Sequence, residues 1–323
     1  MIKVRRVKKG DLARVREVIE AAFADFYERQ LGSRPRQVFG GAQYVHHRWL
    51  MEPWGCYVAE ENESKIVGAG IAVCWGSIGI FGPVAVLTAY QNQKVAQSLI
   101  RAAQGFFDEN KVILQGVVTF PYSPKHLILY QKFGFKPKAL VAVTTKSLER
   151  RDATPAPARG APQVTRFSVL EEGRKKALLG RIRALTGKLF RGLDLTKEIE
   201  IVDGLALGDT LVLEKDRAVL GFAVCHTPGT SEAPYGSLYI KYAAIDPARR
   251  RPEHFLQLVV ACEEFGVGAG CQRILAPVYT AYWRAYQALL AAGYQMEMLM
   301  IRMKRGKHPD YEREDDFVLD DWR

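Results

Sequence analysis

Residues 78–106 read IGIFGPVAVLTAYQNQKVAQSLIRAAQGF. The segment 78–88 is mostly apolar, which is typical of a buried strand, and the polar stretch QNQK follows it at 91–94. From Asn92 onward the apolar side chains recur at helical spacing; they are Val95, Leu99, Ala102, Ala103 and Phe106. The stretch therefore predicts a strand, a polar turn and an amphipathic helix in direct succession.

The residues before this stretch predict strands and helices as well. Residues 2–6 alternate in polarity like a strand, and Asp11 can cap a helix that follows. A second helix is expected around 42–51, and residues 56–60 and 66–74 have the pattern of a hairpin.

After the opening stretch the alternation continues. Residues 111–119 predict a strand, residues 123–132 a short helix ended by Gly134, and residues 140–146 a last strand. Strands and helices in this order predict an α/β fold with a mixed sheet and helices on its faces.

The second half of the chain repeats the same order of elements. Gly134-Phe135 recurs as Gly293-Tyr294, 159 residues later, and the same offset superposes 88–91 on 247–250. The expected elements are a helix over 169–185, a hairpin over 210–226, a strand over 238–245, a helix over 254–265, a strand over 273–278 and a helix over 282–292. We interpret the chain as a tandem duplication of one fold.

A linker separates the two copies. Residues 151–163 read RDATPAPARGAPQ, where Pro, Ala and Gly replace any apolar periodicity. A chain of 323 residues is long enough for two compact units. The prediction is an N-terminal domain over 1–150, a linker over 151–163 and a C-terminal domain over 164–323 that ends in an acidic tail.

Composition excludes several classes of protein. No apolar run approaches the roughly 20 residues of a membrane helix, and the charged start MIKVRRVKKG does not resemble a secretory signal. We therefore expect a cytoplasmic protein with no membrane partner. The five cysteines are an odd number and mostly far apart, which favours reduced core thiols, and the six histidines lack the spacing of metal ligands.

The positive charge is concentrated in the first half. Residues 1–150 hold 21 Lys and Arg against 12 Asp and Glu, and residues 151–323 hold 25 against 23. A basic half suits a polyanionic partner, and charge alone does not distinguish a nucleic acid from a phosphorylated cofactor. No motif that combines aromatic and basic residues favours nucleic acid.

Two motifs resemble the GNAT family of acetyl-CoA-dependent N-acetyltransferases. Residues 91–96, QNQKVA, follow a strand and open a helix as the family's Gln/Arg-x-x-Gly-x-Gly/Ala motif does, with Lys94 where the family prefers Gly. Residues 129–135, LYQKFGF, match the family's Leu-Tyr-x-Lys-x-Gly-Phe closely. The resemblance covers nearly the whole chain if the second half is a divergent copy, and it implies a tandem pair of GNAT folds.

The first motif implies a site for the diphosphate of acetyl-CoA, the expected cosubstrate. A helix start leaves N–H groups without partners and carries positive dipole potential, and both favour a phosphate. Lys94 costs backbone freedom if its φ must be positive, but its ammonium can meet a phosphate. The expected cofactor-binding residues here are Gln91, Asn92, Gln93, Lys94, Val95, Ala96 and Gln97.

The resemblance also implies the catalytic groups. Strand N–H groups near Val84 and Val86 would bind the thioester carbonyl, and Tyr130 would protonate the departing thiolate. Ser123 would cap its helix or touch the pantetheine arm.

A general base is not identified by the sequence. The candidates Glu28, His46, His47 and Glu52 are each interpreted as solvated side chains, and water relayed to the backbone would also serve.

The second copy is expected to have lost its cofactor site. Glu253 stands where the family prefers Gly, Phe255 stands where a small residue is needed, and Leu289 replaces the tyrosine. This half is predicted to be structural or to help form the acceptor groove. The tail 310–323 is expected to be solvated; the alternative is that Phe317, Val318, Leu319 and Trp322 dock it on the basic domain.

The resulting hypothesis is an N-acetyltransferase that moves an acetyl or short acyl group from CoA to a primary amine by direct attack in a ternary complex. The alternative is a non-enzymatic acyl-CoA-binding or scaffold protein. Nucleic-acid binding ranks last. The sequence leaves the acceptor and the oligomeric state open.

Overall fold

The computed structural model describes residues 1–33, 40–149, 160–306 and 311–323. Most of the predicted linker lies outside these ranges. Its last residue, Gln163, begins a strand that pairs with Glu214, so the linker is shorter at this end than the sequence predicts.

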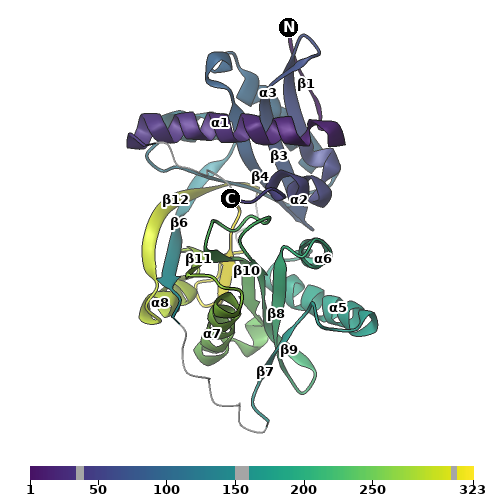
Figure 1. The fold of residues 1–323 in the computed structure, drawn as a ribbon, viewed down its shortest axis with the longest axis vertical. Coiled ribbons are helices and arrows are strands. Elements are labelled where there is room, and N and C mark those ends of the chain that lie inside the picture. The colour runs from purple at the N-terminus through teal and green to yellow at the C-terminus, as the bar shows by residue number, and fades with distance from the viewer. Residues whose placement is uncertain (34–39, 150–159, 307–310) are drawn as a thin grey trace.

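The first half contains every strand and helix that the sequence predicts, in the predicted order (Figure 1). The elements are β1 (Ile2–Arg6), α1 (Leu12–Leu31), α2 (Tyr44–Met51), β2 (Cys56–Glu61), β3 (Lys65–Trp75), β4 (Ile78–Val86), α3 (Val95–Glu109), β5 (Leu114–Thr119), α4 (Pro124–Gln131) and β6 (Lys136–Ser147). Asp11 precedes α1 but does not cap it, because its carboxylate accepts bonds from Lys8 N–H and from Arg5 instead.

The second half repeats this order and adds elements that the sequence analysis missed. Its elements are β7 (Gln163–Arg166), α5 (Glu172–Leu189), α6 (Thr196–Gly204), β8 (Gly208–Lys215), β9 (Ala218–His226), β10 (Ser237–Ile245), α7 (Pro252–Gly268), β11 (Arg273–Tyr279), α8 (Trp283–Ala291), β12 (Gln295–Arg305) and β13 (Val318–Asp320). The missed elements are β7, α6, β12 and β13.

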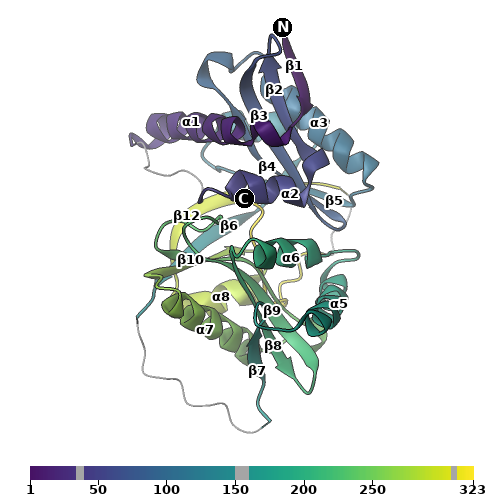
Figure 2. The ribbon, with the colours of Figure 1, turned by 45° about the vertical axis from the view of Figure 1, so that its right-hand side comes forward.

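One continuous sheet joins the two halves. Its strand order is β1-β2-β3-β4-β5-β12-β6-β11-β10-β9-β8-β7, with β13 paired to β10. Strand β12 from the second half lies between β5 and β6 of the first half, and β6 pairs in turn with β11. Figure 2 shows β6 and β12 side by side where the halves meet. Each half therefore completes its sheet with a strand that also pairs with the other half.

The duplication is visible in the register of the parallel strand pairs. In the first half β4 pairs with β5 from Ile78↔Leu114 to Ile80↔Gly116. In the second half β10 pairs with β11 from Ser237↔Arg273 to Tyr239↔Leu275, with every residue shifted by 159. Both pairs part after three residues, as the predicted offset requires.

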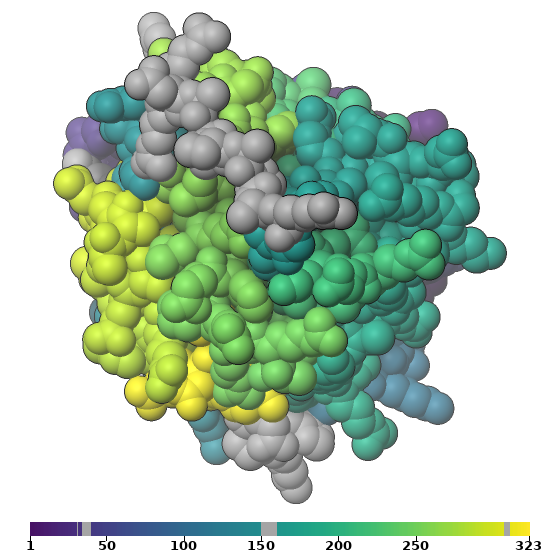
Figure 3. Space-filling model, turned by 90° about the horizontal axis from the view of Figure 1, so that it is seen from below, coloured from purple at the N-terminus to yellow at the C-terminus, as the bar shows by residue number. Residues whose placement is uncertain are grey.

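Helices cover both faces of the sheet in the first half. Successive residues of β2 face opposite sides, so Val58 packs in the cluster with Val18 of α1, whereas Ala59 packs in the cluster with Leu99 of α3. The apolar positions predicted for α3 lie on this inner face. Figure 3 shows the molecule from the end that the second half forms, where most of the visible surface has the teal, green and yellow of that half.

The tail is buried at residues 316–322, so the expectation of a solvated tail is wrong there, whereas residues 313–315 are exposed as expected. Phe317, Val318, Leu319 and Trp322 are each at most 2% exposed. The docking alternative is confirmed for Trp322, whose ring packs at Gly116 of the first half, whereas β13 pairs with β10 of the second half at Tyr242, Ala243 and Ala244. The buried acidic residues of the tail can remain charged because basic groups pair with them. Arg302, for example, donates two hydrogen bonds of 2.8 Å to the carboxylate of Asp320.

The cysteines are free thiols, as predicted. Among the helices of the described ranges, none is both long and apolar enough to cross a membrane. Within the same ranges, no group of His, Cys, Asp and Glu side chains is placed to hold a metal ion.

Candidate functional site

The parting of β4 and β5 leaves backbone donors without a strand partner on one side. Leu87 N–H donates to Val67 O on β3 at 2.9 Å. Because alternate residues of an antiparallel strand point the same way, the N–H groups of Val84 and Val86 point away from β3. On that side β5 no longer pairs with β4. These two amides can therefore donate to a ligand between the parted strands.

A cavity of about 1200 Å³ opens beside the parted strands. Nearly all of the site residues predicted from the sequence line it, namely Val84, Val86, Gln91, Asn92, Lys94, Val95, Ala96, Gln97, Ser123 and Tyr130. Gln93 is the exception, because its side chain turns back to donate to Ala89 O at 3.1 Å. The fold thus gathers the predicted residues around one space.

The turn before α3 has the backbone that an anion site needs. Asn92 and Lys94 have φ values of 64° and 63°, so Lys94 adopts the left-handed conformation for which Gly is normally preferred. Lys94 is the N-cap of α3 but its side chain makes no capping bond. The N–H groups of the first helical turn therefore have no side-chain cap, and Lys94 adds a cation at the same edge of the cavity.

A side-chain bridge braces this turn. Gln91 Nε2 donates to Val86 O at 3.2 Å, and Lys125 Nζ donates to Gln91 Oε1 at 3.0 Å. The bridge joins β4, the turn and α4, and it brings a second cation to the end of the cavity where a diphosphate would lie.

Tyr130 lies on α4 with its side chain 7% exposed and its ring edge against Phe135. Burial raises the pKa of Tyr130 well above its ordinary value, so the phenol stays protonated at neutral pH. Ser123 is the N-cap residue of α4 but its hydroxyl makes no capping bond, so the capping prediction is wrong. Ser123 lines the cavity.

The far end of the cavity is built by both halves. From the first half Tyr27, Tyr44 and Arg48 line it. The second half contributes Glu232, Pro234, Tyr239, Met298, Met300, Trp322 and Arg323. Aromatic rings and methionines dominate this end, and the charged groups among them are paired, as described next.

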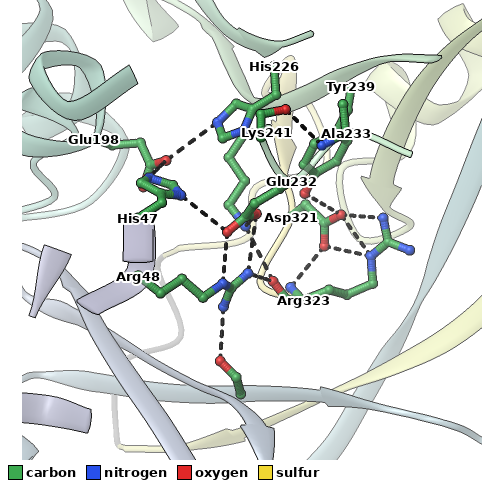
Figure 4. A network of polar contacts seen from close by, with 12 residues as sticks. His47, Arg48, Glu198, His226, Glu232, Ala233, Tyr239, Lys241, Asp321 and Arg323 are labelled. Carbon is green, nitrogen blue, oxygen red and sulfur yellow. Dashed lines mark hydrogen bonds and ion pairs between the residues drawn. The ribbon is translucent and has the colours of Figure 1, made fainter. Parts of the chain in front are cut away.

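A buried ionic network backs this end of the cavity (Figure 4). Glu232 accepts from Arg48 Nε and from Lys241 Nζ, both at 2.8 Å, and His47 lies 3.4 Å away. Although burial opposes its charge, Arg48 and Lys241 hold the pKa of Glu232 well below its usual range. Glu232 is therefore a charged anchor of the two halves and a poor proton acceptor.

His47 is part of this network, so the expectation that it is solvated is wrong. Its side chain is 1% exposed, and its Nε2 lies 2.9 Å from Glu198 Oε1. Burial opposes the charge, but Glu198 and Glu232 together raise the pKa of His47 to about 9. His226 lies 3.7 Å from the same Glu198 oxygen, and burial lowers the pKa of His226.

None of the four residues considered as a general base lines the cavity. They are Glu28, His46, His47 and Glu52. His126 lines the cavity on α4 one helical turn before Tyr130 and was not among the residues predicted from the sequence. Burial and then Lys125 lower the pKa of His126 to about 4, so its ring is neutral at pH 7. The spacing of four residues on a helix was the signal that could have found it.

The corresponding positions of the second half are closed. Phe255 is fully buried and packs against Phe317 of the tail, with ring centroids 5.2 Å apart. Leu289, which corresponds to Tyr130, is also fully buried. In the turn that precedes α7, Arg250 lies 3.4 Å from Asp316 of the tail.

Comparison with known proteins identifies the fold. Residues 52–137 match the family model described as "Acetyltransferase (GNAT) domain". No curated protein sequence matches the chain. A putative acetyltransferase from Pyrococcus horikoshii superposes with a TM-score of 0.69 at 14% identity, covering 99% of this chain and 95% of that one.

Two further solved structures superpose on almost the whole length of this chain. A GCN5-related N-acetyltransferase from Sphaerobacter thermophilus has a TM-score of 0.58 at 11% identity, covering 97% of this chain and 98% of that one. A tandem GNAT protein from the clavulanic acid biosynthesis pathway has a TM-score of 0.59 at 10% identity, with 96% and 99% covered.

Proposed function

We propose that the chain is an N-acetyltransferase whose first half performs the reaction, since residues 52–137 match a GNAT domain and the whole chain has the fold of a tandem GNAT protein. In this proposal an acetyl or short acyl group passes from CoA to a primary amine by direct attack while both are bound. The observation that supports it most is the pair of amides at Val84 and Val86 that face the cavity between parted strands.

The residues present fit acetyl-CoA as a cosubstrate. The uncapped start of α3, the positive φ values at Asn92 and Lys94 and the nearby ammonium of Lys125 favour the diphosphate. The pantetheine arm would extend along β4 toward Tyr130. When bound, the thioester supplies the electrophilic carbonyl carbon.

The chain's own groups would act on the charges that develop. The N–H groups of Val84 and Val86 are positioned to donate to the carbonyl oxygen, and one fixed donor of this kind contributes about 3 kcal/mol to acyl transfer. Tyr130 holds a proton for the departing sulfur, and its raised pKa keeps that proton in place throughout the neutral range.

The amine must lose a proton, and His126 is our candidate to pass it on. Its neutral ring lines the cavity on the same helix as Tyr130, and its lone pair can accept a hydrogen bond from the amine or from a water, while its lowered pKa means that the ring relays the proton to solvent and does not keep it. Its ring packs against Phe26, with centroids 5.1 Å apart, which fixes its orientation. Transfer through one water to this ring would meet the requirement.

The test compares Tyr130→Phe with Tyr122→Phe in the full chain. Tyr122 lies near the same helix but is 45% exposed and does not line the cavity. We expect Tyr130→Phe to lower kcat by about 100-fold with acetyl-CoA affinity unchanged, whereas Tyr122→Phe stays within about twofold. Turnover is followed as CoA release over a panel of primary amines.

Calorimetry separates the alternatives. Acetyl-CoA binding without turnover on any amine would favour the non-enzymatic acyl-CoA-binding protein. Absence of acetyl-CoA binding would contradict both proposals. The full chain is required for this test because β12 completes the sheet of the first half.

A further inference from the structure

The second half has a slot equivalent to the one that would hold the pantetheine arm in the first half. Strands β10 and β11 part after Tyr239↔Leu275, which corresponds to the parting of β4 and β5 after Ile80↔Gly116. Asp246 N–H donates to Leu220 O on β9, as Leu87 N–H donates to Val67 O on β3. The N–H group of Ile245 therefore points into the second slot as that of Val86 points into the first.

In the second half the tail occupies this slot. Strand β13 pairs antiparallel with β10 over Tyr242↔Asp320, Ala243↔Leu319 and Ala244↔Val318. Ile245 N–H donates to Phe317 O at 3.0 Å, and Asp321 N–H donates to Lys241 O at 3.1 Å. The carbonyl of Phe317 thus takes the bond that, in the first half, Val86 N–H would offer to acetyl-CoA.

We propose that residues 311–323 are a built-in occupant of the second donor slot, and that by filling it they place Trp322 and Arg323 as the acceptor-side wall of the first half's cavity. The chain then takes up a single acyl-CoA, and the tail helps to determine which amine is accepted. The statement about the amine rests on the proposed function, whereas the occupancy of the slot does not.

Buried polar contacts hold the tail in place. Asp320 receives two bonds from Arg302, and the Arg302 guanidinium lies between the rings of Tyr279 and Trp322 at 4.0 and 3.9 Å. All of these side chains are at most 1% exposed. Displacing the tail would expose this set together, so it is a fixed part of the structure rather than a transient cover.

The tail is also fitted to the first half. A Cβ on Gly116 of β5 would lie 2.1 Å from the ring of Trp322, so the absence of a side chain at this position is what admits the ring. Gly116 is the last residue that β5 pairs with β4. The tail therefore reaches the point at which the first slot opens.

The last described residue carries a cation to the cavity wall. Arg323 Nε and Nη2 are held by Asp321, and Asp321 also accepts from Tyr239 Oη at 2.8 Å. Arg48 and Lys241 donate to Arg323 O. Both Trp322 and Arg323 line the cavity, at the end away from the turn before α3. These hydrogen bonds fix the position of Arg323, and a residue that selects a substrate needs such a fixed position.

Hydrogen exchange of the full chain, with and without coenzyme A, tests the occupancy. We expect the amides of Ala243 and Ile245 to exchange slowly in both states, and those of Val84 and Val86 to slow by about tenfold or more only when coenzyme A is added. Calorimetry should give one coenzyme A per chain. Fast exchange at Ala243 and Ile245 without coenzyme A, or two molecules bound per chain, would overturn the proposal.

Arg323→Gln tests the acceptor wall, and Arg313→Gln is its control. Arg313 lies in the same segment but pairs with Asp316 and does not line the cavity. The panel contains an aromatic amino acid, its decarboxylated amine, a polyamine and an aminoglycoside. We expect Arg323→Gln to change the KM of the preferred amine by about tenfold with coenzyme A affinity unchanged, and Arg313→Gln to change neither.

The outcomes distinguish this proposal from the proposed function. If Arg323→Gln leaves every KM and the order of preference as in the wild type, the acceptor-wall part is wrong. If the wild type acetylates none of the amines, the proposed function fails, and the exchange and stoichiometry results still decide whether the tail fills the second slot.

Discussion

Replacing Arg302 by Met should destabilise the protein strongly, because it leaves a carboxylate buried without its partner. Asp320 and Arg302 are both 0% exposed, and Arg302 makes two bonds of 2.8 Å to the carboxylate and one of 2.7 Å to Asp320 O. Removing one member of such a pair costs about 3 to 5 kcal/mol. Replacing both members by apolar residues of similar size is often neutral.

The expected change in melting temperature follows from the length of the chain. Unfolding entropy is about 2.1 cal/mol/K per residue, which is about 0.7 kcal/mol/K for 323 residues. A loss of 3 to 5 kcal/mol therefore lowers Tm by about 4 to 7 °C. The double variant R302M/D320L should melt within about 2 °C of the wild type.

Thermal unfolding followed by circular dichroism measures all variants under one condition. Lys3→Met serves as the exposed control, because Lys3 and its partner Glu63 are 62% and 77% exposed; its Tm should shift by less than about 1 °C. A shift below about 1 °C for Arg302→Met would refute the reasoning, since the carboxylate of Asp320 would then not depend on its partner. A double variant as unstable as Arg302→Met would refute it equally.

Three further predictions concern single side chains. The pKa of His47 is about 9 in the folded protein and 6.5 ordinarily, so between these pH values the folded protein binds a proton that the unfolded chain does not. The wild type should therefore lose about 3 kcal/mol of stability as pH rises from 6.5 to 9. Urea unfolding of His47→Gln should show no such pH dependence, and an equal pH dependence would contradict the assignment. Lys94→Gly should weaken coenzyme A binding with a shallower salt dependence in calorimetry and should raise Tm, because Gly adopts a φ of 63° without the steric cost that Lys94 bears. Lys94→Ala should weaken binding in the same way but leave Tm near that of the wild type, because its Cβ keeps the strain; equal Tm values for the two variants would argue against strain. His126→Ala should lower kcat by about 100-fold and recover with added imidazole in the CoA-release assay; a normal rate would exclude it as the proton acceptor.

Local features of the chain were predictable because they depend on neighbours in sequence. The strand, turn and helix of 78–106 follow from a change of apolar period within one stretch, and the structure has β4, the turn and α3 there. The positive φ at Lys94 follows from the geometry of the turn. The 159-residue offset is an internal comparison, and the registers of both parallel pairs reproduce it.

Features that depend on distant partners were decided only by the tertiary structure. Polarity suggested a solvated tail, and the same polarity suggested a solvated His47. Each is buried because a charge from far along the chain meets it, as Glu198 and Glu232 meet His47. A single sequence does not show these partners, since nothing in the local pattern of either segment encodes the other.

The sequence by itself determined the repeated α/β fold, the turn before α3 and the motif around Tyr130, because periodicity and turn residues act over a few positions. Tertiary structure decided three features: the insertion of β12 into the sheet of the first half, the position of the tail in the second slot, and the cavity wall that Trp322 and Arg323 form. The physical reason is that strand pairing uses backbone groups common to all residues. Which strand fills a slot therefore depends on packing and charge pairing across the whole molecule. The pairing of Arg302 with Asp320 is one example.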